Sequence, residues 1–94
     1  MANESRKKAV ALRYDPVADA APRVIGSGQG VIAESILRIA REHNIPIHED
    51  PDLVEILGSL KIGELIPEEI YGAVAEILAF LYRLNKRAKP KIAI

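Results

Sequence analysis

The sequence contains no cysteine, no tryptophan and no threonine, and its only aromatic residues are one phenylalanine and three tyrosines. Without cysteine the chain can form neither a disulfide nor a thiolate metal site, and thiol catalysis is excluded. Net charge is lacking too, because 13 lysines and arginines balance 13 aspartates and glutamates. Nucleic-acid binding normally needs a surplus of cations, so this balance argues against a nucleic-acid partner.

Long hydrophobic stretches are also missing. The longest unbroken apolar run, residues 77–82, is far shorter than the roughly 20 residues that span a bilayer. The apolar run 9–12, which follows three basic residues, is too short for the core of a signal peptide. With 49% hydrophobic and 28% charged residues, the 94-residue chain has the composition of a folded domain. We therefore expect one small, soluble domain located in the cytoplasm.

Apolar periodicity predicts three strands and three helices. The strands cover 9–14, 23–25 and 45–49, and the helices cover 29–43, 51–58 and 67–86. The predicted fold class is α/β, a small mixed sheet of about three strands packed against three to four helices. The order is β-β-α-β-α-α, with a long C-terminal helix. The first two strands should pair antiparallel, and the strand–helix–strand step should be a right-handed parallel crossover.

Local signals mark where these elements begin and end. Asp50 before Pro51 is typical of a helix N-cap, and Asn44 is a candidate left-handed residue at a helix end. The first helix carries an apolar stripe that is expected to face the core: Ile32, Ile36, Ile39 and Ala40. Outside a single domain at 9–87, we expect a flexible N-terminal segment at 1–8 and a flexible tail at 88–94.

A glycine-rich segment, Gly26 to Gly30, stands between a predicted strand and a predicted helix, where phosphate-binding loops occur. It lacks the Walker lysine, and its spacing does not fit G-x-G-x-x-G. The interpretation that we prefer is therefore a plain turn from strand to helix.

The sequence contains no clear metal-binding or catalytic motif. Four acids (Glu49, Asp50, Asp52 and Glu55) follow His48, but acids in the first turn of a helix are explained by the helix dipole. His43 lies in another element, and no further ligand completes a transition-metal set. No serine stands in a nucleophile-elbow context. We expect no metal, no cofactor and no enzymatic activity.

Basic residues gather at both ends of the chain: Arg6, Lys7 and Lys8, then Arg83, Lys86, Arg87, Lys89 and Lys91. If the ends meet, they form a patch for an acidic partner or a membrane surface. The alternative is that both ends are solvated tails.

Several motifs resemble the C-terminal cytoplasmic domain of the FlhB/YscU family of flagellar and type III export proteins. They include residues 9–15 (AVALRYD), 21–25 (APRVI) and, most specifically, 62–71 (IGELIPEEIY). The similarity extends over about residues 9–87, and the family fold, a small sheet wrapped by helices, agrees with the predicted elements.

The resemblance also implies differences. Family members have an N-terminal transmembrane domain and cleave themselves at an Asn-Pro-Thr-His motif. The corresponding positions here are Glu4, Ser5, Arg6 and Lys7. A carboxylate is a poor replacement for the attacking amide of asparagine, so the resemblance implies a stand-alone chain that does not cleave itself.

Two binding surfaces follow from the resemblance. The first is a docking site for export substrates at Ala21, Pro22, Ala75 and Leu78, with Pro22 exposed in a loop; alternatively, Ala75 and Leu78 are ordinary core contacts. The second is the sheet itself. In the family an additional strand precedes the cleavage site, so the sheet should lack one strand here. A truncated FlhB could supply it by strand addition, unless residues 1–8 cover that edge.

These expectations lead to one function and one alternative. The resemblance implies a non-enzymatic accessory protein of flagellar or type III protein export, which binds export-apparatus components, export substrates or a truncated FlhB. The alternative is a small cytosolic regulatory or adaptor domain that kept the fold and has no export role. An enzyme is the least supported class.

Overall fold

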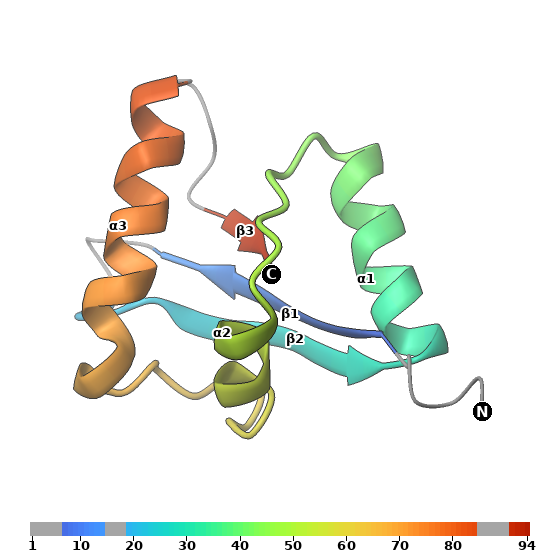
Figure 1. Ribbon diagram of the computed structural model, residues 1–94, viewed down its shortest axis with the longest axis horizontal. Helices are drawn as coiled ribbons and strands as arrows, with labels where there is room; N and C mark the ends of the chain where they lie inside the picture. Colours follow the sequence, from blue (N-terminus) through green and yellow to red (C-terminus); the bar gives the residue numbers. More distant parts are fainter. Residues whose placement is uncertain (1–6, 15–18, 85–90) are drawn as a thin grey trace.

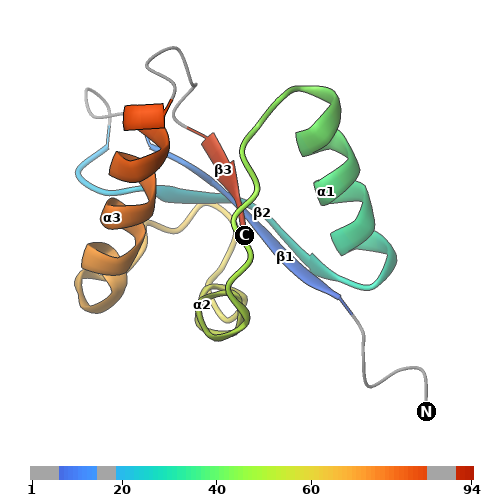
Figure 2. The ribbon, with the colours of Figure 1, turned by 45° about the horizontal axis from the view of Figure 1, so that its top comes forward.

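The computed structural model describes residues 7–14, 19–84 and 91–94. The elements follow in the order β1 (Lys8–Arg13), β2 (Arg23–Gln29), α1 (Val31–Glu42), α2 (Pro51–Leu57), α3 (Glu68–Leu84) and β3 (Lys91–Ala93) (Figure 1). The strands form one sheet in the order β2-β1-β3. Helix α1 lies on one side of the strands, and α2 and α3 lie on the other (Figure 2). The α/β class and the antiparallel pairing of the first two strands are confirmed.

Strand β2 is longer than the sequence predicts. The glycine-rich segment is not a turn, because residues 26–29 continue β2 and pair with residues 8–11 of β1. The register shifts by one residue at Ile25, which has no partner on β1, so β2 contains a bulge there. The glycines that suggested a loop instead allow close packing on the strand.

Gly28 shows why a glycine is needed inside this strand. A Cβ atom built there would lie 2.2 Å from Cγ2 and 2.7 Å from Cβ of Ile32 in α1. Those distances are far below van der Waals contact, so only glycine lets the start of α1 lie this close to β2. The chain then turns into α1 at Gly30, whose φ of 58° is also one that glycine adopts readily.

The third strand comes from a different part of the chain than expected. Residues 45–49 form no strand; only Ile47 makes an isolated parallel bridge, to Ala93. Pro46 lacks an N–H group and so cannot contribute a full ladder. The third strand is β3, inside the segment 88–94 that the sequence predicts to be a flexible tail. The observed order is therefore β-β-α-α-α-β.

β3 lies along the edge of β1 that faces away from β2. It pairs antiparallel with β1, and beyond the named strand the backbones of Val10 and Ile94 exchange two hydrogen bonds, of 2.8 and 2.9 Å. On its other side, the Ala93 N–H donates to the Pro46 carbonyl and the Ala93 carbonyl accepts from the His48 N–H. β3 thus gives β1 a second neighbouring strand that the sequence does not predict.

The helix ends agree well with the local signals. Asn44 has a left-handed φ of 56°, and its N–H bonds to Arg41 O while Ile45 N–H bonds to Ala40 O, which is a Schellman ending. The Asp50 side chain accepts a 3.0 Å hydrogen bond from the Leu53 N–H at the start of α2. Helix α3 begins with Glu68 and Glu69, which complement its dipole. The predicted helix positions 85 and 86 lie outside the described residues.

The main core lies between the sheet and helices α2 and α3. Its members are buried aliphatic residues of the strands, of α2 and α3, of the connections between elements and of the chain end: Val10, Leu12, Ala21, Val24, Leu53, Val54, Leu57, Ile66, Val74 and Ile94. On the opposite face, α1 buries only Ala33 and Ala40. The expectation that the whole stripe of α1 faces the core is wrong, because Ile32 is 59% and Ile39 46% exposed.

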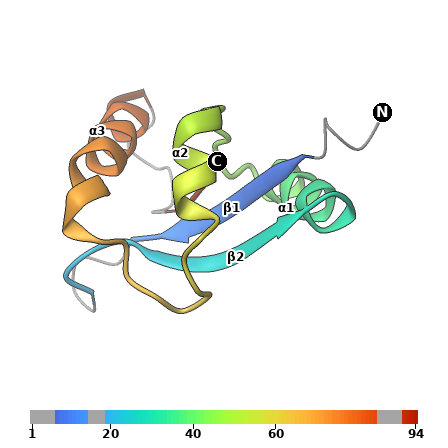
Figure 3. The same ribbon diagram turned by 60° about the horizontal axis from the view of Figure 1, so that its bottom comes forward.

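The outer edge of β2 is covered over its first part by the connection between α2 and α3 (Figure 3). Val24 N–H bonds to Glu64 O, Gly63 N–H to Val24 O, and Ile66 N–H to Pro22 O. This pairing holds the start of β2 next to the segment that leads into α3. Among the described residues, no helix is both long and apolar enough to cross a membrane.

Candidate functional site

A buried carboxylate anchors the turn that contains Ala21 and Pro22. The side chain of Asp19 is 5% exposed and lies 2.7 Å from the Arg23 guanidinium through Oδ1. Its Oδ2 lies 3.9 Å from the Arg13 guanidinium, and no group in the described part of the chain donates a hydrogen bond to it. Arg23 in turn donates to the Gly63 carbonyl. This ion pair ties the turn to the connection before α3.

Pro22 is not exposed as the sequence suggested. Its side chain is among the most completely buried in the described protein, and Ala21 is also buried and belongs to the main core. The segment before α3 holds this turn in place, because the Ile66 N–H donates a 2.9 Å hydrogen bond to the Pro22 carbonyl. A substitution of Pro22 therefore disturbs the core as well as any surface.

Helix α3 contributes the other two expected docking residues. Ala75 and Leu78 are partly buried, and Leu78 packs against the same core cluster that contains Ala21. The start of β2 and α3 lie side by side in Figures 1 to 3. Of the four expected docking residues, only Ala75 and Leu78 on α3 are partly accessible, and Ala21 and Pro22 are buried.

A pair of phenols joins β1 to this region. Tyr14 follows β1, and Tyr71 lies in the first turns of α3. A hydrogen bond with Tyr71 raises the pKa of Tyr14 above its ordinary value of 10.0, and burial and the charge of the neighbouring phenolate raise it further. The Tyr14 phenol is therefore neutral up to a higher pH than an unperturbed tyrosine.

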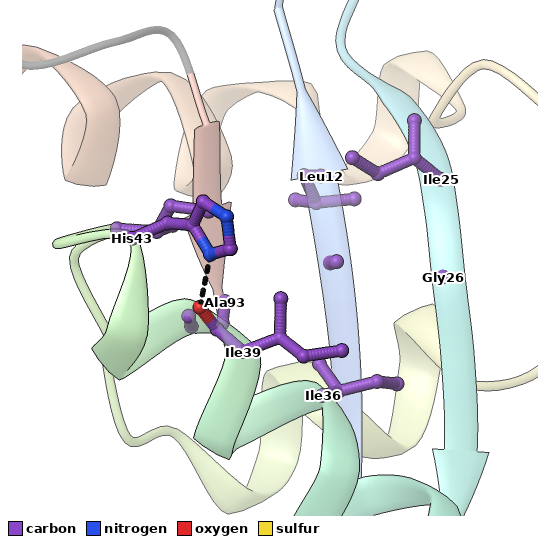
Figure 4. A pocket seen from close by; sticks show the side chains of 10 residues that line it. Leu12, Ile25, Gly26, Ile36, Ile39, His43 and Ala93 are labelled. Atoms are coloured by element: carbon purple, nitrogen blue, oxygen red, sulfur yellow. Dashed lines mark hydrogen bonds between the residues drawn. The ribbon is translucent and has the colours of Figure 1, made fainter.

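A second apolar site lies on the other face of the sheet, under α1. Figure 4 shows a cavity with Ile36 and Ile39 of α1 on one side and Leu12, Ile25 and Gly26 of the strands on the other. Its volume is about 320 Å³, and Ala93 and His43 lie at its edge near β3. The His43 Nδ1 lies 3.0 Å from the Ile39 carbonyl, which fixes the ring beside the opening.

The acidic cluster does not assemble into a metal site. Asp50 caps α2, and Glu55 forms a 2.6 Å ion pair with Lys8. His48 lies 3.9 Å from Asp50, whose carboxylate is already bonded to the helix. In the described residues, no group of three or more histidines and acids comes together.

Of the four expected cleavage-motif positions, only Lys7 is among the described residues. Glu4, Ser5 and Arg6 lie outside the described residues, as do Lys86, Arg87 and Lys89 of the basic C-terminal group. Lys7 is exposed, and its carbonyl accepts a 2.8 Å hydrogen bond from the Gly30 N–H. Lys7 therefore extends the β1–β2 ladder by one hydrogen bond.

Comparison with known proteins identifies the family of this chain. Residues 4–81 match the family model described as the FlhB HrpN YscU SpaS Family. The chain belongs to the FlhB/YscU family. The match covers all four residues of the expected docking site, Ala21, Pro22, Ala75 and Leu78, but ends before β3.

Individual members of the FlhB/YscU family give the scale of the similarity. YlqH of Bacillus subtilis is 46% identical over 85 residues, which are 90% of this chain and 91% of YlqH. The flagellar biosynthetic protein FlhB of Salmonella typhimurium is 42% identical over 78 residues, 82% of this chain. That alignment spans only 20% of FlhB, so the chain corresponds to about a fifth of that protein.

Solved structures of the FlhB/YscU family have the same fold. The cytoplasmic domain of FlhB from Shewanella putrefaciens superposes with a TM-score of 0.78 and 40% identity, covering 87% of this chain and 67% of that structure. The PscU C-terminal domain gives a TM-score of 0.74 with 28% identity, covering 79% and 95%. The similarity that the sequence motifs indicated is therefore confirmed in sequence and in structure.

The cavity under α1 is hard to predict from the sequence. Ile36 and Ile39 read as ordinary core positions, and nothing marked Gly26 as part of a strand. The usable signal was the run of residues 91–94 after a proline, Lys-Ile-Ala-Ile, whose apolar composition is compatible with a strand. Only the fold shows that this run lies beside β1.

Proposed function

We propose that this chain is a non-enzymatic accessory protein of flagellar or related type III protein export, acting in the cytoplasm. Its partners are components of the export apparatus, export substrates or a truncated FlhB. The proposal is supported by one main observation: the chain is similar over most of its length to the cytoplasmic part of FlhB, including the region that contains the candidate docking residues.

The docking surface that we propose is centred on Ala75 and Leu78 of α3. Small and aliphatic side chains leave a shallow apolar area, which suits an apolar anchor residue of a partner. Ala21 and Pro22 are buried in the turn before β2, which the Asp19–Arg23 ion pair holds. Their contribution is to set the shape of the surface, and that of Ala75 and Leu78 is to contact the partner.

The test is capture of partners from the native organism with purified full-length protein, followed by mass-spectrometric identification. Ala75→Glu places a charge on the proposed surface. Ala73→Glu is the matched control, because Ala73 is exposed on a different side of the same helix. We expect wild type and Ala73→Glu to recover named export-apparatus proteins or export substrates, and Ala75→Glu to lose at least nine-tenths of them.

Two results would contradict the proposal. Recovery of no export protein by the wild type would favour the regulatory or adaptor alternative. Equal recovery by Ala75→Glu, in a protein whose circular dichroism and melting temperature match those of Ala73→Glu, would remove α3 from the binding surface while leaving the export role intact.

A further inference from the structure

The two edges of β2 differ in how their backbone groups are bonded. The Gly30 N–H donates a 2.8 Å hydrogen bond to the Lys7 carbonyl, so residue 30 faces β1. Residues of an antiparallel strand face the neighbouring strand and the outside in alternation, and the register is regular over residues 26–29. The even-numbered residues therefore bond to β1, whereas the N–H and C=O groups of Ser27 and Gln29 point away from it.

The outer side of this half of β2 has no neighbour among the described residues. The connection between α2 and α3 bonds to β2 as far as Val24 and no further. Figures 1 and 3 show no described segment along the outer side of the second half of the strand. Such an edge is a template for another strand, and proteins usually protect it with bulges, charges or proline. The bulge of β2 precedes this edge, and residues 24–33 contain neither a charge nor a proline.

Apolar side chains flank this edge on the face of the sheet that carries α1. Ile25, just before the edge, is 39% exposed and lines the cavity under α1. Ile32 is 59% exposed and lies directly over Gly28, since its Cγ2 atom would be 2.2 Å from a Cβ atom at that position. One exposed isoleucine therefore stands near each end of the edge.

We propose that two copies of this chain pair through this edge of β2, antiparallel and centred on Ser27, and so join their sheets. The two Ser27 residues then exchange backbone hydrogen bonds, and Gly26 of each copy lies opposite Gly28 of the other. Because antiparallel pairing brings opposite ends of the two edges together, Ile25 of each copy comes beside Ile32 of the other. This inference does not depend on the proposed function, because it concerns β2 and α1 and not α3.

The sequence of this edge suits a second copy of the chain. Helix α1 lies so close over Gly28 that not even a methyl group fits there. A strand that pairs beside Gly28 therefore needs a small residue opposite it on that face, and the second copy provides Gly26. The chain has 13 cations and 13 anions, so net charge does not oppose association of identical copies. A two-fold interface uses the same patch on both copies, so the assembly ends at a dimer.

The oligomeric state is measured by analytical ultracentrifugation of the full-length protein over a series of concentrations, with amide hydrogen exchange at both ends of the series. Ser27→Pro removes the outward N–H and keeps the β1–β2 bonds, because a strand tolerates proline where its N–H faces outside. Ser27→Ala is the matched control. Ile32→Lys places a charge in the apolar contact, and its control is Phe80→Lys, at a residue of similar exposure (56%) on α3.

Cross-linking tests the register. Since the chain has no cysteine, a single introduced cysteine detects only contacts between copies. Opposite residues of a hydrogen-bonded antiparallel pair have Cα atoms about 5.5 Å apart, which is within the range of a disulfide. Ser27→Cys should therefore form a disulfide-linked dimer under mild oxidation about tenfold faster than Ala73→Cys, whose cysteine is exposed on α3.

We expect the wild type, Ser27→Ala and Phe80→Lys to dimerise as the concentration rises, with slower exchange of the Ser27 amide in the dimer. Ser27→Pro and Ile32→Lys should weaken dimerisation about tenfold while keeping the circular dichroism of the wild type. If Ser27→Pro fails to fold, Ile32→Lys and Ser27→Cys decide. A wild type that is monomeric at about 1 mM, a dimer in which the Ser27 amide is not protected, or equal cross-linking of Ser27→Cys and Ala73→Cys would each overturn the proposal.

Discussion

Gly28→Ala should destabilise the protein although it adds a single methyl group. The new Cβ atom would meet the Cγ2 and Cβ atoms of Ile32 at 2.2 and 2.7 Å. Rotation of the Ile32 side chain relieves only the first contact, because its Cβ is fixed to the α1 backbone. The start of α1 must therefore move away from β2, and overpacking of this kind costs about 1–3 kcal/mol. For a domain of this size the melting temperature should fall by about 10 °C.

Two further variants separate steric conflict from the general effect of replacing glycine. Gly72→Ala is the matched control, because a Cβ at Gly72 in α3 meets nothing within 4 Å. Alanine is the better helix former by about 1 kcal/mol, so this change should stabilise the protein. Ile32→Ala removes the Cγ2 atom that the new Cβ at position 28 would meet at 2.2 Å. Because the Ile32 side chain is largely exposed, this change alone should reduce stability only slightly.

The assay is urea denaturation followed by circular dichroism, for wild type, the three single variants and the double variant Gly28→Ala with Ile32→Ala. We expect the double variant to be more stable than the sum of the single effects predicts, by about 1 kcal/mol. The close approach of α1 to β2 would be refuted if Gly28→Ala matched wild type within 0.5 kcal/mol. Strict additivity with Ile32→Ala would show that the Cβ atom at position 32, which alanine keeps, causes the whole loss.

Three other substitutions test contacts described above. Asp50→Ala should cost about 1 kcal/mol in urea denaturation through loss of the α2 cap, and Asp50→Asn, which keeps an acceptor, should cost much less. Arg23→Ala leaves the buried Asp19 carboxylate without its nearest cation and should cost about 2 kcal/mol; adding Asp19→Asn should recover part of the loss, and a strictly additive result would contradict the ion pair. Because the pKa of Tyr14 is raised in the folded state, it contributes stability that is fully present below about pH 10 and is lost as the pH rises through the folded-state pKa. The free energy of unfolding should therefore fall less steeply with pH above about pH 10 in Tyr14→Phe than in wild type.

Features set by neighbouring residues could be predicted from the sequence. β1, the three helices, the Asp50 cap and the left-handed Asn44 all depend on contacts within a few residues, and all are present. The family could be predicted too, because its motifs are contiguous strings. Family membership does not settle the docking residues, and the structure corrects only the exposure that was expected for Pro22.

Features set by distant residues could not be predicted. The glycines of β2 resemble a loop in isolation and become strand residues only because α1 packs against them. Residues 45–49 have strand-like side chains, but Pro46 limits their pairing and leaves one bridge, at Ile47. β3 is three residues long, and its place beside β1 depends on partners far away in the sequence. No local pattern contains that information.

The pairing of Val10 with Ile94 also bears on how fast the domain assembles. These two residues come from nearly opposite ends of the described chain, and their two hydrogen bonds close a loop that contains all three helices. Closing so large a loop costs conformational entropy before the contact stabilises the chain. Such pairings therefore form late in folding. Weakening β3 should therefore accelerate unfolding more than it slows folding. The lifetime of the native state, rather than the speed of reaching it, is what the final strand controls.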